Sequence, residues 1–122
     1  MHSGKYRIRS ARTTLALMCA AALPASACWH EAAERYRLNG ELLHAIARTE
    51  SRLDPRAIGR NVNGSHDIGL MQINSRWLPV LARHGITERD LFDPCTSIQV
   101  GAWILAANVQ RHGYTWDADR AY

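Results

Sequence analysis

The sequence predicts a small, mainly α-helical domain in which several helices surround one long buried helix. Three observations lead to this prediction. Apolar residues recur at helical spacing between residues 40 and 51. The stretch from Pro94 to Gln110 contains no charged residue, which is typical of a central buried helix. No segment shows the convincing alternation of apolar and polar residues that indicates a half-buried strand.

The N-terminus has the features of a secretory signal peptide. A basic stretch over residues 5–12 precedes nine apolar residues, Leu15 to Leu23, and small residues up to Ala27 provide a cleavage site. A membrane anchor would need about 20 apolar residues. We therefore expect residues 1–27 to be removed on export. Residues 28–122 would then form one domain in the periplasm or outside the cell, with no stable membrane span.

Removal of this leader changes the net charge. The whole chain has 15 Lys and Arg and 11 Asp and Glu, giving +4. The leader contains four of the basic residues and no acidic ones, so residues 28–122 carry 11 of each sign. The remaining basic residues are scattered arginines and do not form the basic patch typical of nucleic-acid-binding proteins. Nucleic acid is therefore not an expected partner.

Two cysteines, Cys28 and Cys95, remain after Cys19 leaves with the leader. In an oxidising compartment the simplest interpretation is a disulfide between them. The alternative is that Cys28, which directly follows the predicted cleavage site, carries a lipid anchor. The preceding Ala-Ser-Ala lacks the Leu that would be expected three positions upstream of a lipidated cysteine.

The first helix is expected from Cys28 to Arg37, with Ala32, Ala33 and Tyr36 on one side. Asn39 is a suitable N-cap for a second helix from Gly40 to Ser51.

The second helix places a carboxylate on its apolar face. Residues 42, 43, 46 and 47 form that face, and Glu50 falls on the same stripe. Burial of a carboxylate raises its pKa, and a carboxylic acid that stays protonated at neutral pH can act as a general acid. The alternative is a structural ion pair with one of the neighbouring arginines.

The segment after this helix is expected to be a polar loop from Arg56 to Asp67, followed by the short apolar turn GLMQIN, residues 69–74. Gly69 could allow the backbone to approach a ligand closely. Met71 and Gln72 would supply an apolar wall and an amide. This combination suits a sugar with an N-acetyl group.

The remaining elements are helical. Ser75 is expected to cap a helix over residues 76–84, and Thr87 with Asp90 resembles a capping box. The most apolar helix follows and ends before Gly113. The histidines show no metal-ligand spacing, so no metal is expected.

Two motifs together resemble a known family. Glu50-Ser51 is followed, 19 residues after Glu50, by GLMQIN. This pair is similar to the soluble lytic transglycosylases of the goose-lysozyme-like superfamily, and especially to their small secreted members associated with type III and type IV secretion and conjugation systems. The segments AIARTES, NGSHDIGLMQINSRWLP and LFDPCTSIQVGAWILA carry the resemblance, which runs from about Cys28 to the end of the chain. It implies a lysozyme-like fold and no cofactor.

The resemblance implies that Glu50 is the sole catalytic acid and base. Glu50 would protonate the β-1,4-glycosidic oxygen between N-acetylmuramic acid (MurNAc) and N-acetylglucosamine (GlcNAc) in peptidoglycan. The N-acetyl oxygen of the substrate would stabilise the developing cation, in contrast to the scheme with two carboxylates. Glu50 would then accept the proton of the muramic acid 6-hydroxyl, and a 1,6-anhydro product would form without water.

The resemblance also implies substrate-binding residues. Ser51 would position groups around the anhydro-forming sugar, and Tyr122 matches the tyrosine that holds the catalytic glutamate in the family. The glycan groove would be lined by Gly69, Leu70, Met71 and Gln72. The Asn-x-Gly and closing helix that normally follow the tyrosine are absent. We therefore expect the C-terminal part of the domain to be incomplete, in either a fragment or a naturally shorter protein.

Three functions are consistent with these features. The first is a peptidoglycan lytic transglycosylase that opens the cell wall for a secretion or conjugation apparatus. The second is a truncated, non-catalytic glycan-binding or assembly factor with the same fold. The third is a lysozyme-type hydrolase that uses water.

Overall fold

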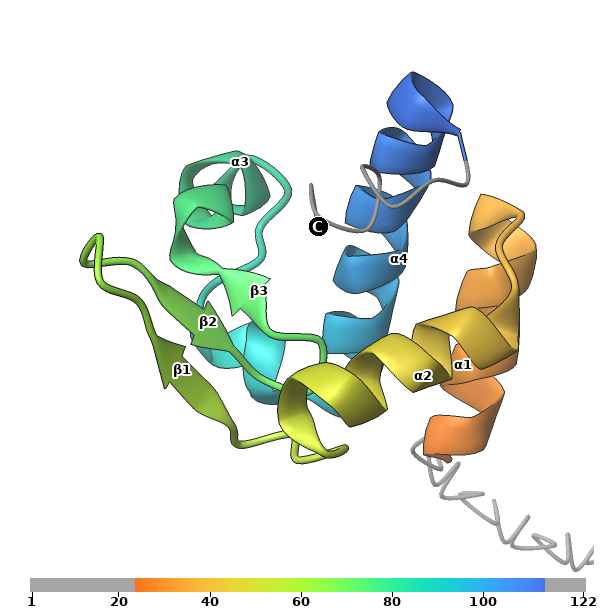
Figure 1. Ribbon diagram of the computed structural model, residues 1–122, viewed down its shortest axis with the longest axis horizontal. Coiled ribbons are helices and arrows are strands. Elements are labelled where there is room, and N and C mark those ends of the chain that lie inside the picture. The colour runs from red at the N-terminus through yellow and green to blue at the C-terminus, as the bar shows by residue number, and fades with distance from the viewer. Residues whose placement is uncertain (1–23, 114–122) are drawn as a thin grey trace, which may run out of the picture.

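The computed structural model describes residues 24–113 and shows a mainly α-helical fold with a small sheet (Figure 1). Helix α4 stands between α1 on one side and the sheet on the other, and α2 crosses near its lower end. The elements in chain order are α1 (Ala25–Tyr36), α2 (Gly40–Ser51), β1 (Ile58–Arg60), β2 (His66–Ile68), β3 (Ile73–Asn74), the 3-10 helix η1 (Ser75–Trp77), α3 (Leu78–Ala82), the 3-10 helix η2 (Arg89–Phe92) and α4 (Pro94–His112). The predicted mainly α class is confirmed.

Helix α2 begins and ends where the sequence predicts. The side chain of Asn39 accepts hydrogen bonds from the backbone N–H groups of Glu41, at 2.8 Å, and Leu42, at 3.3 Å, so it caps the helix. Leu43 and Ala47 are fully buried on the face that packs into the core. Because α2 also contacts α1 and α4, its burial joins the N-terminal part of the domain to the central helix.

Helix α4 is the long buried helix that the uncharged stretch predicts. The carboxylate of Asp93 accepts a hydrogen bond from the backbone N–H of Thr96 at 2.9 Å and caps the helix, while Pro94 occupies its first turn. The residues buried along it are Ser97, Ile98, Val100, Gly101, Ala102, Ile104, Leu105 and Asn108. Burial of several large apolar side chains on one helix supplies much of the driving force for folding.

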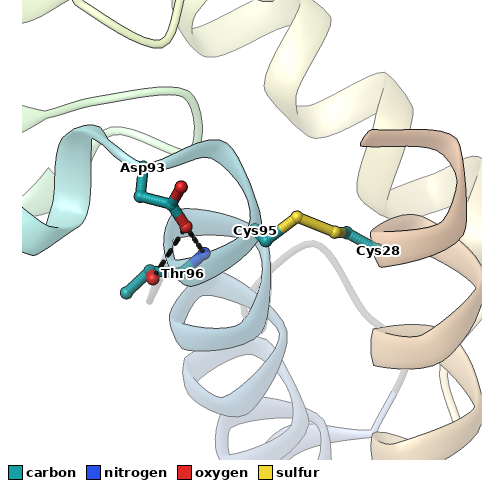
Figure 2. The surroundings of a disulfide bond; sticks show 4 residues. All are labelled: Cys28, Asp93, Cys95 and Thr96. Atoms are coloured by element: carbon teal, nitrogen blue, oxygen red, sulfur yellow. Dashed lines mark hydrogen bonds between the residues drawn. A yellow bond between two sulfur atoms is a disulfide. The ribbon is translucent and has the colours of Figure 1, made fainter. Parts of the chain in front are cut away.

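A disulfide connects α1 to the first turn of α4 (Figure 2). It joins Cys28 and Cys95, whose Cα atoms are 5.4 Å apart, across a sequence separation of 67 residues. The structure thus contains the predicted pairing. Cys28 is 1% exposed, and a lipid anchor at this residue would need the same sulfur atom.

A three-stranded antiparallel sheet replaces part of the predicted polar loop. Ile58 pairs with Ile68 between β1 and β2, and Asp67 pairs with Asn74 between β2 and β3. The prediction of a continuous loop over residues 56–67 was therefore wrong. Strands of two or three residues are too short to show an alternating pattern in the sequence.

The start of the next helical segment also differs from the prediction. Asn74, and not Ser75, is the cap: its side chain accepts the backbone N–H of Arg76 at 3.0 Å. The hydroxyl of Ser75 instead accepts the backbone N–H of His66 at 3.1 Å, which ties β2 to η1. The helix expected over residues 76–84 is divided into η1 and the short α3.

Two tryptophans complete the core around α4. Trp77 and Trp103 meet edge to face with ring centroids 5.8 Å apart, and both pack against the buried cluster. Among the described residues, no helix is both long and apolar enough to cross a membrane.

Candidate functional site

Glu50 lies at the surface at the C-terminal end of α2. The expectation that it is buried on the apolar stripe was wrong, because Arg48, Thr49 and Glu50 are all exposed. The last turn of α2 therefore extends beyond the part of the helix that packs into the core. An acidic residue in a last turn meets the partial negative charge of the helix C-terminus. The helix dipole by itself therefore does not favour Glu50 at this position.

Ser51, the next residue, fixes the end of α2 against the GLMQ turn, residues 69–72. Its Oγ lies 2.6 Å from the carbonyl oxygen of Leu70 and 3.0 Å from that of Ala47. The shorter contact is a hydrogen bond donated across 19 residues of sequence. The structure therefore brings together the two motifs that the sequence singles out, through a side chain adjacent to Glu50.

Gly69 allows close packing within the protein. Its φ is +76°, and a Cβ atom at this position would lie 2.3 Å from the carbonyl oxygen of Leu91. The requirement for glycine thus comes from the backbone before α4, and close approach of a ligand to the Gly69 backbone stays a prediction. Leu70 is 5% exposed and Met71 is fully buried, so these two side chains belong to the core beneath the surface.

The amide of Gln72 holds the turn and the first strand together. Its Nε2 donates to the carbonyl oxygen of Gly69 at 3.0 Å and to that of Ala57 at 3.2 Å. A Cβ at Gly59 would lie 2.8 Å from Oε1 of Gln72, so this glycine makes room for the amide. The Gln72 side chain is half-buried and already has a structural role.

Polar side chains hold the turn between β1 and β2 and connect the strands of the sheet. The carboxylate of Asp67 accepts hydrogen bonds from the amides of Asn74 at 2.9 Å and Asn61 at 3.2 Å. The ring of His66, in β2, contacts the carboxylate of Glu88, which joins this strand to the segment before η2. The cluster of Asn, Ser and Asp in NVNGSHD was the available signal, since such side chains often bond to turns.

The carboxylates that follow Glu50 are engaged in local structure. Asp54 accepts the backbone N–H of Arg56 at 2.9 Å, and Asp67 accepts hydrogen bonds from the amides of Asn61 and Asn74.

Across residues 24–113, no three or more His, Cys, Asp or Glu side chains are arranged to hold a metal ion. Tyr122 and Trp116 lie outside the described residues, so the predicted contact of Tyr122 with Glu50 is not placed.

Comparison with known proteins identifies a family match over residues 27–122, described as Transglycosylase SLT domain. Invasion protein IagB of Salmonella typhimurium (strain LT2) is 48% identical over 96 residues, which cover 78% of this chain and 60% of that protein. Protein IpgF of Shigella flexneri is 40% identical over 96 residues, covering 78% and 63%. A Peptidoglycan-binding-like protein of Escherichia coli O157:H7 is 38% identical over 130 residues, covering 100% and 78%. The chain thus spans about 60% of the length of the first of these relatives.

Proposed function

The chain belongs to the Transglycosylase SLT domain family, and on this premise we propose that it is a peptidoglycan lytic transglycosylase. It cleaves the β-1,4 bond between MurNAc and GlcNAc and leaves 1,6-anhydro-MurNAc ends. The observation that supports this most directly is the position of Glu50. The carboxylate is exposed at a helix end, and its neighbour Ser51 is hydrogen-bonded to the GLMQ turn.

Glu50 acts first as acid and then as base. Its carboxylic acid gives a proton to the glycosidic oxygen, so the GlcNAc side leaves as an alcohol. The N-acetyl oxygen of MurNAc stabilises the positive charge that develops at C1. The carboxylate of Glu50 then accepts the proton of the 6-hydroxyl while the 6-oxygen bonds to C1. Glu50 ends in its starting state, and no water is consumed.

The proposed mechanism uses one protein carboxylate. Glycosidases of the usual kind need a second carboxylate as nucleophile or base. Asp54 and Asp67, the nearest acidic residues along the chain after Glu50, accept hydrogen bonds from the backbone of Arg56 and from the hairpin amides. Both carboxylates thus have structural roles, and in the proposed mechanism the substrate's own N-acetyl group takes the place of a second protein carboxylate.

The groove for the glycan strand runs past the end of α2 and the GLMQ turn. Because Leu70 and Met71 are buried, their side chains support the wall of this groove from below. Gly69 and Gln72 fix the backbone of the wall, and Ser51 fixes its distance from α2. Tyr122 completes the site by holding Glu50.

The enzyme is exported by residues 1–27 and acts in the periplasm or outside the cell. There it opens peptidoglycan for a secretion or conjugation apparatus. Two relatives support this assignment by name, since one is called an invasion protein and another a peptidoglycan-binding-like protein.

The test is a digestion of purified peptidoglycan with the exported protein, its Glu50→Gln variant and a matched Glu41→Gln variant. Glu41 is exposed on the opposite face of the same helix. We expect anhydro-MurNAc ends, detected by mass spectrometry, to fall at least about a hundredfold with Glu50→Gln because a general acid contributes that much or more. Glu41→Gln should cleave normally.

The other outcomes identify the competing functions. Reducing ends in place of anhydro ends would show a lysozyme-type hydrolase. Binding to peptidoglycan without cleavage, by a folded protein, would show a non-catalytic glycan-binding or assembly factor. Normal cleavage by Glu50→Gln would contradict the proposed role of Glu50 itself.

A further inference from the structure

Ser97 is a fully buried polar residue in the first turns of α4. Its side chain is 0% exposed, and it lies beside the apolar residues Ile98 and Val100 in a helix that is otherwise largely buried. A buried hydroxyl is unfavourable unless it forms a hydrogen bond. Its Oγ accepts the backbone N–H of Met71 at 3.0 Å, across 26 residues of sequence. This contact connects α4 to the GLMQ turn.

The turn that donates this hydrogen bond has an unusual backbone. Gly69 and Gln72 have φ values of +76° and +51°, and the N–H of Gln72 donates to the carbonyl of Gly69 at 3.0 Å. A positive φ at a residue other than glycine is unfavourable and persists only where the surroundings hold it. A Cβ at Gly69 would lie 3.5 Å from the hydroxyl of Ser97. Ser97 is therefore part of the surroundings that hold this turn.

The opposite side of the turn holds the end of α2. Leu70 and Met71 are consecutive residues, and their backbone groups form hydrogen bonds with two different helices, α2 and α4. The carbonyl of Leu70 accepts from Ser51 at 2.6 Å, and the N–H of Met71 donates to Ser97 at 3.0 Å. A single peptide unit, that between Leu70 and Met71, thus carries both hydrogen bonds. A shift of this peptide plane must change both contacts, because the peptide group is rigid.

We infer that Ser97 is a positioning residue for Glu50, acting through the peptide group between Leu70 and Met71 and through Ser51. The inference rests on the proposed function of Glu50 as catalytic acid and base. Ser97 itself does not touch the substrate. It fixes the peptide plane that orients Ser51, and Ser51 is adjacent to Glu50 at the end of α2. Displacements of about 1 Å at such a group can lower a rate by up to about a hundredfold.

The test compares Ser97→Val with Ser97→Thr in the exported protein. Valine and threonine have nearly the same shape, and only threonine keeps the hydroxyl, so their comparison isolates the hydrogen bond. We expect Ser97→Val to lower kcat on peptidoglycan at least about tenfold with KM nearly unchanged, because the glycan contacts persist while Glu50 is misplaced. Ser97→Thr should restore most of kcat. Amide hydrogen exchange, measured by NMR, should become faster with valine at Met71 and also in the last turn of α2.

Different results would overturn the inference about Ser97 and the proposed function. Equal kcat for the valine and threonine variants would overturn the inference, and so would faster exchange that is confined to Met71. If wild-type protein cleaves nothing, the proposed function fails. The exchange at the end of α2 then still decides whether Ser97 controls that helix end.

A second pair of variants serves if Ser97→Val does not fold. Ser97→Ala and Ser51→Ala interrupt the same path at its two ends. Their combined loss of kcat should be no greater than the larger single loss, because residues that act as a unit are not additive. Additive losses would mean that the two residues act separately and would overturn the inference.

Discussion

Two parts of this molecule are held together by different interactions. The helical side, α1 and α4, is joined by apolar burial and the disulfide between Cys28 and Cys95. The hairpin side, residues 50–74, also buries Leu70 and Met71 in the core, but its backbone is in addition fixed by hydrogen bonds from side chains, as at Ser51 and Gln72. Apolar burial is non-directional and sums over area, whereas hydrogen bonds depend on orientation. The helical side therefore contributes mainly stability, and the hairpin side contributes geometry.

The largest expected effect on stability comes from the disulfide on the helical side. We expect Cys28→Ala with Cys95→Ala to lower the free energy of unfolding by about 4 kcal/mol, because the loop between them restricts the unfolded chain. The measurement is chemical denaturation of both proteins under the same conditions. The fraction that remains folded should cleave peptidoglycan with the wild-type kcat. A fall in kcat with unchanged stability would mean that the disulfide fixes the geometry of the site and does not stabilise the fold, contrary to this comparison.

The next effect is expected at Gly69 on the hairpin side. Gly69→Ala places a methyl group against the carbonyl oxygen of Leu91, at an unrelaxed distance of 2.3 Å, and imposes a positive φ on alanine. The turn must shift, and we expect a loss of about 3 kcal/mol together with loss of cleavage. Thermal unfolding and the peptidoglycan digestion would measure the two losses.

Gly85 provides a matched control for this substitution. Its φ is +73°, close to the +76° of Gly69, but a Cβ there would meet no atom within 4 Å. Gly85→Ala should therefore cost only the strain of the left-handed conformation, about 1 kcal/mol, and should leave cleavage intact. Equal effects of the two substitutions would show that backbone strain, and not the contact with Leu91, explains the need for glycine at position 69.

The same contrast explains what the sequence could predict. The bounds of α2, the cap at Asn39 and the buried α4 follow from periodicity and capping chemistry, which are local properties. The disulfide could be predicted because only two cysteines, Cys28 and Cys95, lie outside the predicted leader. The sheet could not be predicted in this way, because its short strands are set by pairing and by hydrogen bonds such as that between Asp67 and Asn74.

The sequence motifs predict that Glu50-Ser51 and the GLMQ turn act together, but they do not predict how buried these residues are. The motif places Glu50 and the GLMQ turn in one site, and the structure joins the end of α2 to this turn through Ser51. The prediction that Glu50 is buried was wrong. Helical spacing predicts which side of the helix a residue occupies, but not how far along the helix axis the buried core extends. Ser97 was missed because a serine in an apolar helix gives no sign of its partner 26 residues away.

A substitution at Gln72 removes the contribution of a single side-chain amide on the hairpin side. Gln72→Met keeps the length of the side chain but removes the donor to Gly69 and Ala57, and we expect a loss of about 2 kcal/mol as two carbonyl contacts disappear. Cleavage should decrease as well. Gln110→Met, at an exposed position on α4, is the control and should change stability by less than about 0.5 kcal/mol. Equal stability of the two variants would show that the Gln72 amide does not brace the turn.

The smallest effect is expected at Asp90, in η2 between the two sides. The backbone N–H of Thr87 donates to its carboxylate at 2.8 Å, and the Thr87 hydroxyl donates at 3.0 Å. These bonds, with a small contribution from Arg89, lower the pKa of Asp90 despite the opposing effect of desolvation. A carboxylate with a lowered pKa in the folded state adds stability above its unfolded pKa of about 3.9. This contribution is lost as the pH falls through the folded pKa.

Asp90→Asn should therefore reduce stability at pH 7 and have less effect at pH 3. The carboxylate is exposed, so salt weakens its interactions and the change should be smaller than at Gln72. Urea unfolding of both proteins at the two pH values measures the difference. A loss that is the same at pH 7 and pH 3 would mean that the charge of Asp90 contributes nothing beyond the shape of the cap. Cleavage should not change, because this cap belongs to neither the hairpin hydrogen bonds nor the path from Ser97 to Glu50.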